Sequence, residues 1–545
     1  MEKENKKDSA TKKTSTTKKE EVVEKEEVVE EEAVEEEAVE EKVEKKEKPV
    51  KAEKEKTENA FAEKLDKFFG ITAKGSTIRT EIIAGLTTFF AMCYILLVNP
   101  DQMTGFTRFT FAFAPEVMQV YYAIFIATAI GAIIGTLLMG LYAKMPFAQA
   151  PGMGLNSFFA TAFIFGAFTA LELAPANIPE MYKAGLSIIL VAGFLFLIIS
   201  ITGLRKAIIK GMPIVLKKAI PAGIGLFIAY IAFQNAGIIQ ANPFVQVQLV
   251  DLTAGWYEIA GPIAALLGFF LIAALSKTKL KGGSIIIGIL GTTVLYYLFN
   301  IGNADAYVAF TDPLVNPFTA FKNFGEVGLF GAFQGFKYWT AENVFSVIML
   351  VITFCLVDMF DTLGTLQGTC AEADMLDEEG NPQRLNQAMA SDAIATVTGA
   401  LAGTSTVTTY VESASGISVG GRTGLTSVVV AALFFLAMFL SPIATIIPGV
   451  ATAPALMFVG VLMLKNIKDV DFSDITNAVP AFMTLVMMPL TYSISNGIAL
   501  GMISYVILKA ASIRSASDTK EFFKNNYILI ILSILFLLRF FLVKM

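Results

Sequence analysis

The chain has 545 residues, of which 54% are hydrophobic and 17% charged, with a formal net charge of −6 and a mean hydropathy of +0.61. Soluble domains do not bury so large an apolar fraction, so this composition indicates a membrane protein. No histidine is present, which excludes Ser-His-Asp triads, His-ligated zinc or haem, and imidazole proton relays.

Residues 1–60 contain the whole charge imbalance, with 15 Lys and 21 Asp or Glu. The rest of the chain is neutral overall, which gives no electrostatic support for nucleic-acid binding. The tract is a low-complexity run of Glu, Lys and Val. Its valine pairs recur every five or six residues and not every 3.5, so a coiled coil is poorly supported. We expect a disordered, Glu/Lys-rich cytoplasmic tail that is not a signal peptide.

Apolar stretches of roughly 17–25 residues follow from Glu81 onward, and this length crosses a hydrocarbon core of about 30 Å. We predict an all-α polytopic membrane protein with about fourteen transmembrane segments. A further apolar run, Tyr527–Val543, is either an interfacial helix or a fifteenth span. The predicted spans are 81–98, 119–141, 150–168, 183–203, 213–234, 257–276, 283–300, 342–362, 386–402, 403–419, 424–441, 447–464, 474–492 and 494–511.

The distribution of Lys and Arg among the connectors predicts the orientation, because basic residues in short loops stay cytoplasmic. With a cytoplasmic N-terminus, thirteen basic residues fall inside and four outside. The inside residues are Lys144, Arg205, Lys206, Lys210, Lys217, Lys218, Lys277, Lys279, Lys281, Arg384, Arg422, Lys465 and Lys468. The outside residues are Arg108, Lys183, Lys322 and Lys337.

The third span contains a break, because Gln149, a Gly-Met-Gly turn and Asn156 precede two phenylalanines. We interpret Gly154 as a place of close backbone approach, and Asn156 as a polar contact for a ligand. Phe158 and Phe159 would offer a surface on which a flat ligand stacks. The alternative is ordinary helix packing through small residues.

The eighth span contains Asp358 and Asp361, which are three residues apart and therefore on one side of a helix. A carboxylate inside a membrane is costly unless it has a partner or faces a polar cavity, so both are candidate functional residues. The alternative is that the helix ends near Thr362 and that both acids are hydrated at its cytoplasmic end.

The tenth span is unusually polar for a membrane segment. Its first part, TSTVTTYV, favours a short strand, and ESASGIS favours a half-helix, with Glu412 at the junction. Irregular backbone at membrane depth occurs where it is buried in protein or lines a cavity, and a helix N-terminus there offers unpaired N–H donors. Thr409 and Ser413 flank this junction and are further candidate binding residues. The alternative is a polar loop between spans.

A faint internal repeat relates spans one to seven to spans eight to fourteen. The fifth and twelfth spans both contain Ile-Pro followed by small residues, in 217–233 and 444–463, and the third and tenth are both broken. A repeat of seven spans reverses its orientation, which is the inverted architecture of many secondary transporters. The paired broken spans therefore predict the substrate site.

Several segments resemble the signatures of AzgA-like purine permeases, a branch of the xanthine/uracil permease (nucleobase–cation symporter) family. The similarity extends from about Phe68 to Leu508. It is carried by APGMGLNSFF (150–159), LVDMFDTLGTL (356–366), TSTVTTYVESASGISVGGRTGLTSVV (404–429) and VPAFMTLVMMPLTYSISNGI (479–498).

This resemblance implies two inverted repeats of seven segments, with short strands and half-helices in segments 3 and 10. It also implies proton-coupled uptake of hypoxanthine, guanine or adenine, with Asp361 and Glu412 contacting the base. The implied division is a core domain at 75–205 and 342–441, a gate domain at 206–300 and 442–512, and a C-terminal segment at 513–545.

From these residues we expect a secondary transporter in the cell membrane that binds a neutral purine and uses no cofactor or metal. Glu412, Asp361 or Asp358 would hold the coupled proton. Sodium coupling and a homodimer stay open. The alternatives are an anion transporter of the same fold, which the acids at the broken spans disfavour, and an intramembrane aspartyl enzyme, whose Gly-Leu-Gly-Asp element is absent.

Overall fold

The structure is a computed structural model that describes residues 62–202, 212–242, 245–303, 317–372, 375–376, 382–440 and 446–542. The predicted tail at 1–60 lies outside the described residues. The described residues from Ile71 to Leu542 form one compact unit, whereas residues 62–69 are helical and belong to the other.

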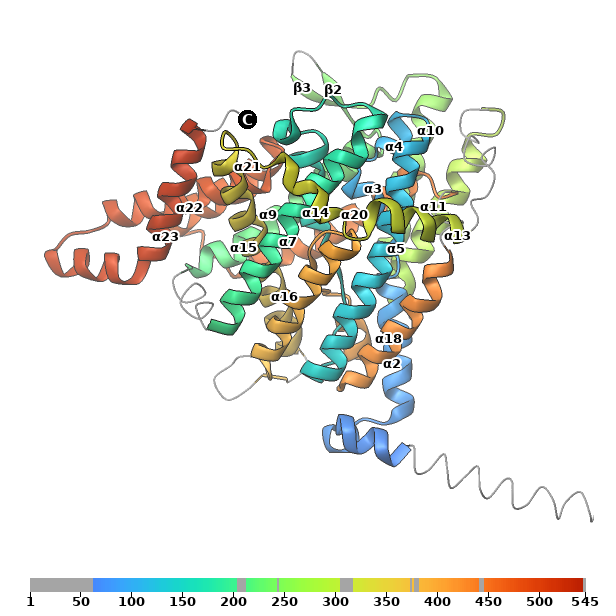
Figure 1. Cartoon of the computed structure of the whole chain (residues 1–545), viewed down its shortest axis with the longest axis horizontal. Coiled ribbons are helices and arrows are strands. Elements are labelled where there is room, and N and C mark those ends of the chain that lie inside the picture. Colours follow the sequence, from blue (N-terminus) through green and yellow to red (C-terminus); the bar gives the residue numbers. More distant parts are fainter. Residues whose placement is uncertain are drawn as a thin grey trace, which may run out of the picture. The chain divides into compact units, whose positions relative to one another are not determined.

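The first half of the compact unit consists almost entirely of helices (Figure 1). The first predicted span divides at Cys93 and Tyr94 into two helices, and the third divides into a short strand and a short helix. Labels η mark short 3₁₀ or π helices. The elements are η1 (Thr72–Lys74), α2 (Ile78–Met92), α3 (Ile95–Met103), α4 (Thr107–Thr110), α5 (Pro115–Leu137), η2 (Leu138–Ala143), β1 (Gln149–Pro151), α6 (Met153–Phe159), η3 (Ala160–Ile164), η4 (Ala167–Thr169), η5 (Pro175–Asn177), α7 (Ile178–Thr202), α9 (Ile214–Asn235), β2 (Ile239–Asn242), β3 (Gln246–Leu249), α10 (Trp256–Leu275), η6 (Lys281–Gly283) and α11 (Ser284–Phe299).

The second half repeats this plan, with a broken segment at the position that corresponds to β1 and α6. The described part of the connector between the two halves forms short helices, which pack on α5 and α7. The elements are α13 (Pro317–Asn323), η8 (Phe324–Gly328), α14 (Gly331–Gly335), η9 (Phe336–Tyr338), α15 (Val344–Glu372), α16 (Leu385–Ala402), β4 (Val407–Thr409), α17 (Ser413–Ser418), α18 (Gly424–Ala437), η10 (Met438–Leu440), α20 (Gly449–Leu464), η11 (Lys465–Asp469), α21 (Ile475–Leu490), α22 (Ile494–Ala511) and α23 (Ala516–Leu542).

Within the described residues, eight helical segments are long and apolar enough to cross a membrane, judged by length and composition. They correspond to predicted spans one, two, four to eight, and fourteen. Shorter apolar helices correspond to spans three and eleven to thirteen, and α16 and the β4–α17 pair to spans nine and ten. The prediction of a polytopic, predominantly helical fold is therefore confirmed. The apolar run at 527–543 is part of the longer helix α23.

Local sequence explains where several of these elements begin and end. Thr77, Thr423, Asp474 and Ser493 each accept a backbone N–H hydrogen bond at the start of a helix, which is the role that N-cap residues fill. Helix α16 ends before Gly403, whose φ of +105° is accessible to glycine at little cost.

The helices form two groups according to their contacts. Helices α9, α10, α11, α20, α21 and α22 pack on one another, and the second group comprises α2, α3, α5, α6, α7, α15, α16, α17 and α18. In the first group, α9 and α20 approach closely at Gly225 and Gly460, because a Cβ on either residue would lie under 3.0 Å from the other's carbonyl oxygen. The inverted repeat pairs these two helices, the fifth and twelfth segments.

The two Ile-Pro elements that the sequence matched in these spans lie at different places in their helices. Pro448 is the N-cap residue of α20, whereas Pro221 lies inside α9. The proline inside α20 is Pro454.

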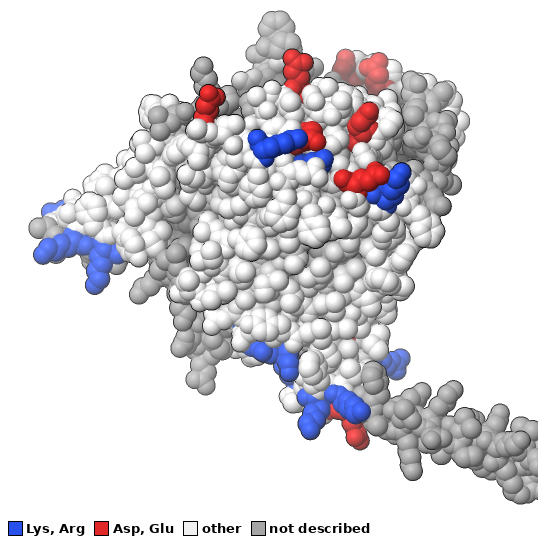
Figure 2. Space-filling model, viewed as in Figure 1, with Lys and Arg blue, Asp and Glu red and all other residues white. Residues whose placement is uncertain are grey.

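Figure 2 shows charged side chains near the upper end of the view, where acids predominate, and near the lower end and the left margin, where Lys and Arg predominate, with a broad uncharged area between them. Large apolar side chains such as Ile201, Phe270 and Ile507 are exposed on the long helices. Exposed apolar surface of this extent suits contact with lipid. The four basic residues of the predicted outside connectors all have acidic partners, in the ion pairs Arg108–Asp101, Lys183–Glu180, Lys322–Glu326 and Lys337–Glu180.

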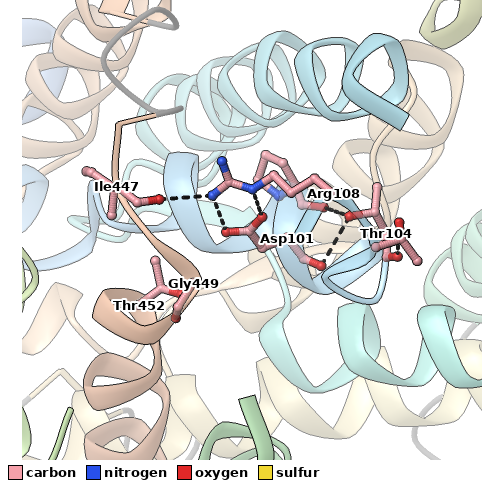
Figure 3. A network of polar contacts seen from close by, with 8 residues as sticks. Asp101, Thr104, Arg108, Ile447, Gly449 and Thr452 are labelled. Atoms are coloured by element: carbon pink, nitrogen blue, oxygen red, sulfur yellow. Dashed lines mark hydrogen bonds and ion pairs between the residues drawn. The ribbon is translucent and has the colours of Figure 1, made fainter. Parts of the chain in front are cut away.

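One of these pairs joins the two groups of helices (Figure 3). Asp101 and Arg108 are fully buried, and Nε and Nη2 of Arg108 lie 2.5 and 2.9 Å from the two carboxylate oxygens of Asp101. Nη2 also donates to the carbonyl oxygen of Ile447, just before α20, at 3.1 Å. The sequence placed Arg108 in an external loop and did not predict its burial, which depends on this bidentate partner.

Candidate functional site

The two broken segments meet at a pair of short strands. β1 and β4 are antiparallel, with Gln149 opposite Thr409 and Pro151 opposite Val407. The Tyr410 N–H extends this pairing by donating to the carbonyl oxygen of Ala148 at 3.0 Å. Because both strands are buried, the pairing satisfies backbone groups that neither water nor a helix reaches. The predicted strands and half-helices of segments 3 and 10 are confirmed.

Glu412 lies directly before α17, at the end of the tenth segment's irregular stretch. Its side chain is buried, and its Oε1 accepts a hydrogen bond from the hydroxyl of Tyr94 at 2.7 Å. Tyr94 comes from the break between α2 and α3 and is also 3.5 Å from the sulfur of Met153, the first residue of α6. Three broken segments of the chain therefore meet at Glu412.

Asp361 lies on α15 and faces the start of the other half-helix. Its Oδ2 is 3.9 Å from the position that a Cβ on Gly152 would occupy, and it interacts electrostatically with Glu412. Asp361 is partly exposed, and its carboxylate makes no hydrogen bond to any residue that the structure describes. It is thus an available acceptor beside the strand pair.

Asp358 does not accompany Asp361 at the strand pair, although the two are three residues apart. It is buried against α16, where the Thr396 hydroxyl donates to its Oδ2 at 2.7 Å. A second buried acid, Asp392 of α16, interacts electrostatically with Asp358 and accepts a hydrogen bond from Nε2 of Gln149 at 2.9 Å.

The two phenylalanines point in different directions. The Phe158 ring packs on Phe354 of α15, with 4.8 Å between the ring centroids. Phe354 is seven residues before Asp361, so it lies on the same face of α15. Phe159 instead packs between α6 and α7, against Phe163 and the backbone of Gly185. Only Phe158 is therefore on the side of the helix that carries Asp361.

Gly154 and Asn156 have different neighbours. A Cβ on Gly154 would collide with Ile224 of α9, so this glycine permits α6 to approach the other group of helices. Asn156 is fully buried and accepts a hydrogen bond from the hydroxyl of Ser405, while its Nδ2 has no partner among the described residues.

The predicted residues at the tenth segment serve mainly to hold the strands. Thr409 Oγ1 accepts a hydrogen bond from Gln149 Nε2 at 3.3 Å, and Ser413 Oγ accepts one from the Ala148 N–H at 3.0 Å. The expectation of unpaired N–H donors at this half-helix is wrong. The N–H groups of Ser413, Ala414 and Ser415 donate to the carbonyls of Tyr410, Val411 and Glu412, because a turn precedes α17.

Two residues of the site were missed in the sequence. Asp392 follows the same rule as Asp358, an acid inside an apolar stretch, and that rule could have identified it. Tyr94 gave no comparable signal, because a tyrosine in an apolar helix is ordinary and only its contact with Glu412 distinguishes it. Among the residues that the structure describes, no group of three or more His, Cys, Asp or Glu is arranged to hold a metal ion.

Comparisons with known proteins show the family to which the chain belongs. A family model described as "Permease family" matches residues 79–500. The chain belongs to this permease family. The resemblance to xanthine/uracil permeases is thus confirmed, and the strand pair with its two acids lies inside the matched part of the permease.

Relatives of this permease match over most of their length. A putative permease of Methanocaldococcus jannaschii is 38% identical over 87% of this chain and 98% of its own. The adenine permease AdeP of Escherichia coli K12 is 38% identical, covering 83% of this chain and 92% of its own. The guanine/hypoxanthine permease PbuG of Bacillus subtilis 168 is 36% identical, covering 86% and 99%.

Solved structures resemble the permease in fold alone. The transmembrane domain of a cyanobacterial bicarbonate transporter, BicA, has a TM-score of 0.52 at 16% identity, covering 77% of this chain and 97% of that one. SLC26A9 has a TM-score of 0.52 at 11% identity, covering 79% of this chain and 66% of that one. This likeness supports the fold of core and gate domains.

Proposed function

We propose that this permease imports a purine nucleobase across the cell membrane by proton symport. The observation that carries the proposal is the presence of two carboxyl groups, Asp361 and Glu412, beside the pair of strands where both broken segments meet. The relatives named as adenine and guanine/hypoxanthine permeases support a purine as the substrate. Because these relatives are permeases, transport rather than catalysis is the activity to test.

Asp361 and Glu412 suit the edge of a neutral purine. A purine carries ring N–H and exocyclic donors, and a carboxylate accepts hydrogen bonds only. Asp361 has no competing donor among the described residues, and Glu412 keeps acceptor sites beyond the bond from Tyr94. The apolar surface of Phe158 beside Phe354 suits the flat face of the base.

Alternating access would come from movement between the two groups of helices. We assign 75–205 and 342–441 to the core, 206–300 and 442–512 to the gate, and 513–545 to a C-terminal segment. The substrate acids belong to the core, and Gly154 meets Ile224 of the gate beside them. The excess of basic residues in the predicted inside connectors supports a cytoplasmic N-terminus.

The deciding experiment is uptake of radiolabelled adenine, guanine and hypoxanthine in a host that lacks purine transport. We expect the unmodified chain to restore uptake of at least one purine. Glu412→Gln and Asp361→Asn should each reduce it by tenfold or more, because each replaces an acceptor oxygen with an N–H donor.

Cys370→Ser is the control, since this buried cysteine forms no disulfide and lies nine residues, about 13 Å along α15, beyond Asp361. Equal surface expression is verified for every variant. Full uptake by both acid variants would remove these residues from the mechanism, and an inactive unmodified chain would refute purine transport.

A further inference from the structure

A second pair of acids lies between α15 and α16, separate from the acids at the strand pair. Asp358 and Asp392 are 1% and 0% exposed. Thr396 is one turn after Asp392 on α16 and donates to Asp358 at 2.7 Å, while Thr362, one turn after Asp358 on α15, lies beside Asp392. Each acid therefore faces the other helix.

Both acids have an oxygen without a partner. Asp358 Oδ2 accepts from Thr396 and Asp392 Oδ1 accepts from Gln149, whereas Asp358 Oδ1 and Asp392 Oδ2 have no hydrogen-bond partner among the described residues. A buried polar atom without a partner costs about 1–3 kcal/mol, and more where it is charged. Two such oxygens on interacting acids require an explanation.

No basic residue compensates this pair. The titratable groups that interact with it are Asp361 and Cys355, both on α15, and no Lys or Arg is among its interactions in the described residues. The strands β1 and β4 and the half-helix α6 contain no titratable residue. The parts of α5 and α7 that approach it, around Gly135 and Gly193, contain none either.

We propose that Asp358 and Asp392 together hold one exchangeable proton, at a site distinct from the acids that face the purine. This inference rests on the proposed function and names the place of its coupling ion. Two neighbouring carboxylates in a low dielectric do not both ionise, so one proton serves the pair. As an O–H on one acid, the proton removes one buried charge and turns an oxygen of that acid into a hydrogen-bond donor.

The surroundings of Asp358 and Asp392 suit a bound proton better than a metal ion. A cation such as sodium or calcium is held by several oxygen ligands, and this site provides only two free carboxylate oxygens. A proton needs only one oxygen to carry it, which either acid provides.

The pair is connected to the substrate site through side chains of the strands. Gln149 Nε2 bonds both Asp392 and Thr409, and the Thr362 hydroxyl accepts from the Thr409 N–H at 3.3 Å. Thr396 Oγ1 accepts from the Val407 N–H at 3.2 Å. Loss of the proton adds a negative charge at the acid pair, next to both strands. This charge changes the stability of the arrangement in which the half-helices bind purine.

The test uses the purified full chain in proteoliposomes, with two assays of radiolabelled purine. Exchange of external labelled for internal unlabelled purine at equal pH measures binding and movement without net proton flux. Accumulation driven by an inside-alkaline pH gradient measures coupling. We expect Asp392→Asn and Asp358→Asn to retain measurable exchange and to lose at least tenfold in accumulation.

Two further variants separate coupling from folding. Asp392→Glu keeps a titratable group and is expected to recover accumulation relative to Asp392→Asn. Asp474→Asn is the matched control, because Asp474 caps α21 at the surface and asparagine is an equally good cap, so both assays stay unchanged.

Infrared spectroscopy of the unmodified protein gives a readout that does not depend on transport. We expect one band of a buried protonated carboxyl group, which each of the two single variants removes or displaces, because each variant changes the surroundings of the same proton. Separate bands, each lost in only one variant, would overturn the sharing of a proton.

Undiminished pH-driven accumulation by Asp392→Asn, or accumulation driven by sodium without a pH gradient, would also overturn this inference. Neither result contradicts purine transport. Absence of both exchange and accumulation in the unmodified protein would instead overturn the proposed function, and the two failures are therefore distinguishable.

Discussion

Tyr94 fixes the position of Glu412 by a single buried hydrogen bond. The tyrosine is fully buried, and its hydroxyl is 2.7 Å from Glu412 Oε1. A hydrogen bond to a charged group contributes about 1.5–3 kcal/mol, and a buried carboxylate without it is free to rotate toward other donors. Tyr94 is therefore a positioning residue for Glu412, the acid that we propose contacts the purine.

Replacing Tyr94 by phenylalanine is expected to raise the KM for purine about tenfold and to change the maximal rate less. The ring remains, so packing is preserved and only the orientation of Glu412 is lost. Uptake measured over a range of purine concentrations checks this.

Tyr121→Phe is a matched control for the tyrosine variant. Tyr121 is equally buried, but its hydroxyl has no partner among the described residues, so its removal should leave KM unchanged. An unchanged KM in Tyr94→Phe would show that Glu412 does not need this bond.

At the scale of elements, the N-terminus of helix α18 is capped by a carboxylate from another helix. Glu81 of α2 is fully buried and accepts hydrogen bonds from the N–H groups of Arg422, Thr423 and Thr426 and from the Thr426 hydroxyl. The first N–H groups of a helix lack partners within the helix, and the positive end of its dipole favours an anion. Glu81 thus joins α2 to α18.

Glu81→Ala is expected to lower the melting temperature of the purified protein markedly, because several buried donors lose their acceptor at about 1–3 kcal/mol each. Glu81→Gln should have a smaller effect, since its amide oxygen still accepts.

Glu116→Ala is the control for the Glu81 variants, because Glu116 is exposed in the first turn of α5 and its loss should shift stability little. Equal melting temperatures for Glu81→Ala and Glu116→Ala would contradict the capping role of Glu81.

On the scale of the whole molecule, the contact between the two groups of helices includes few polar interactions among the residues that the structure describes. The hydrogen bond from Arg108 to the Ile447 carbonyl is one, and the Thr353 and Ser495 hydroxyls, 3.4 Å apart, are another. The Arg108–Asp101 pair also has an apolar shell, with the guanidinium 4.2 Å from the Phe109 ring centroid. Such sparse polar contact suits two groups that move relative to each other.

Arg108→Gln is expected to destabilise the protein by about 3–5 kcal/mol, because it leaves Asp101 buried and without its cation. Combining it with Asp101→Asn should recover part of this loss, since no buried charge then remains.

Unfolding of the two single variants and the double variant in detergent forms a double-mutant cycle that measures this coupling. Additive losses in the cycle would mean that the two side chains do not depend on each other.

The sequence by itself determined the membrane class, the order of the helices and the two broken segments, and it made Asp361 and Glu412 candidate acids. These features depend on local composition: apolar length specifies a span, β-branched and small residues specify a break, and an acid within an apolar stretch is conspicuous wherever it lies. The family resemblance carried the rest of the predicted architecture.

The tertiary structure decided which side chains meet. Asp358 turns to Asp392 and not to the strand pair, Phe159 packs away from the acids, and Arg108 is buried rather than exposed. Each outcome depends on the rotation of a helix about its axis and on the helix that becomes its neighbour. Neither is encoded by spacing within one segment, because Asp358, Phe159 and Arg108 each meet a residue of another segment. These residues, Asp392, Gly185 and Ile447, lie 34, 26 and 339 residues away in the chain.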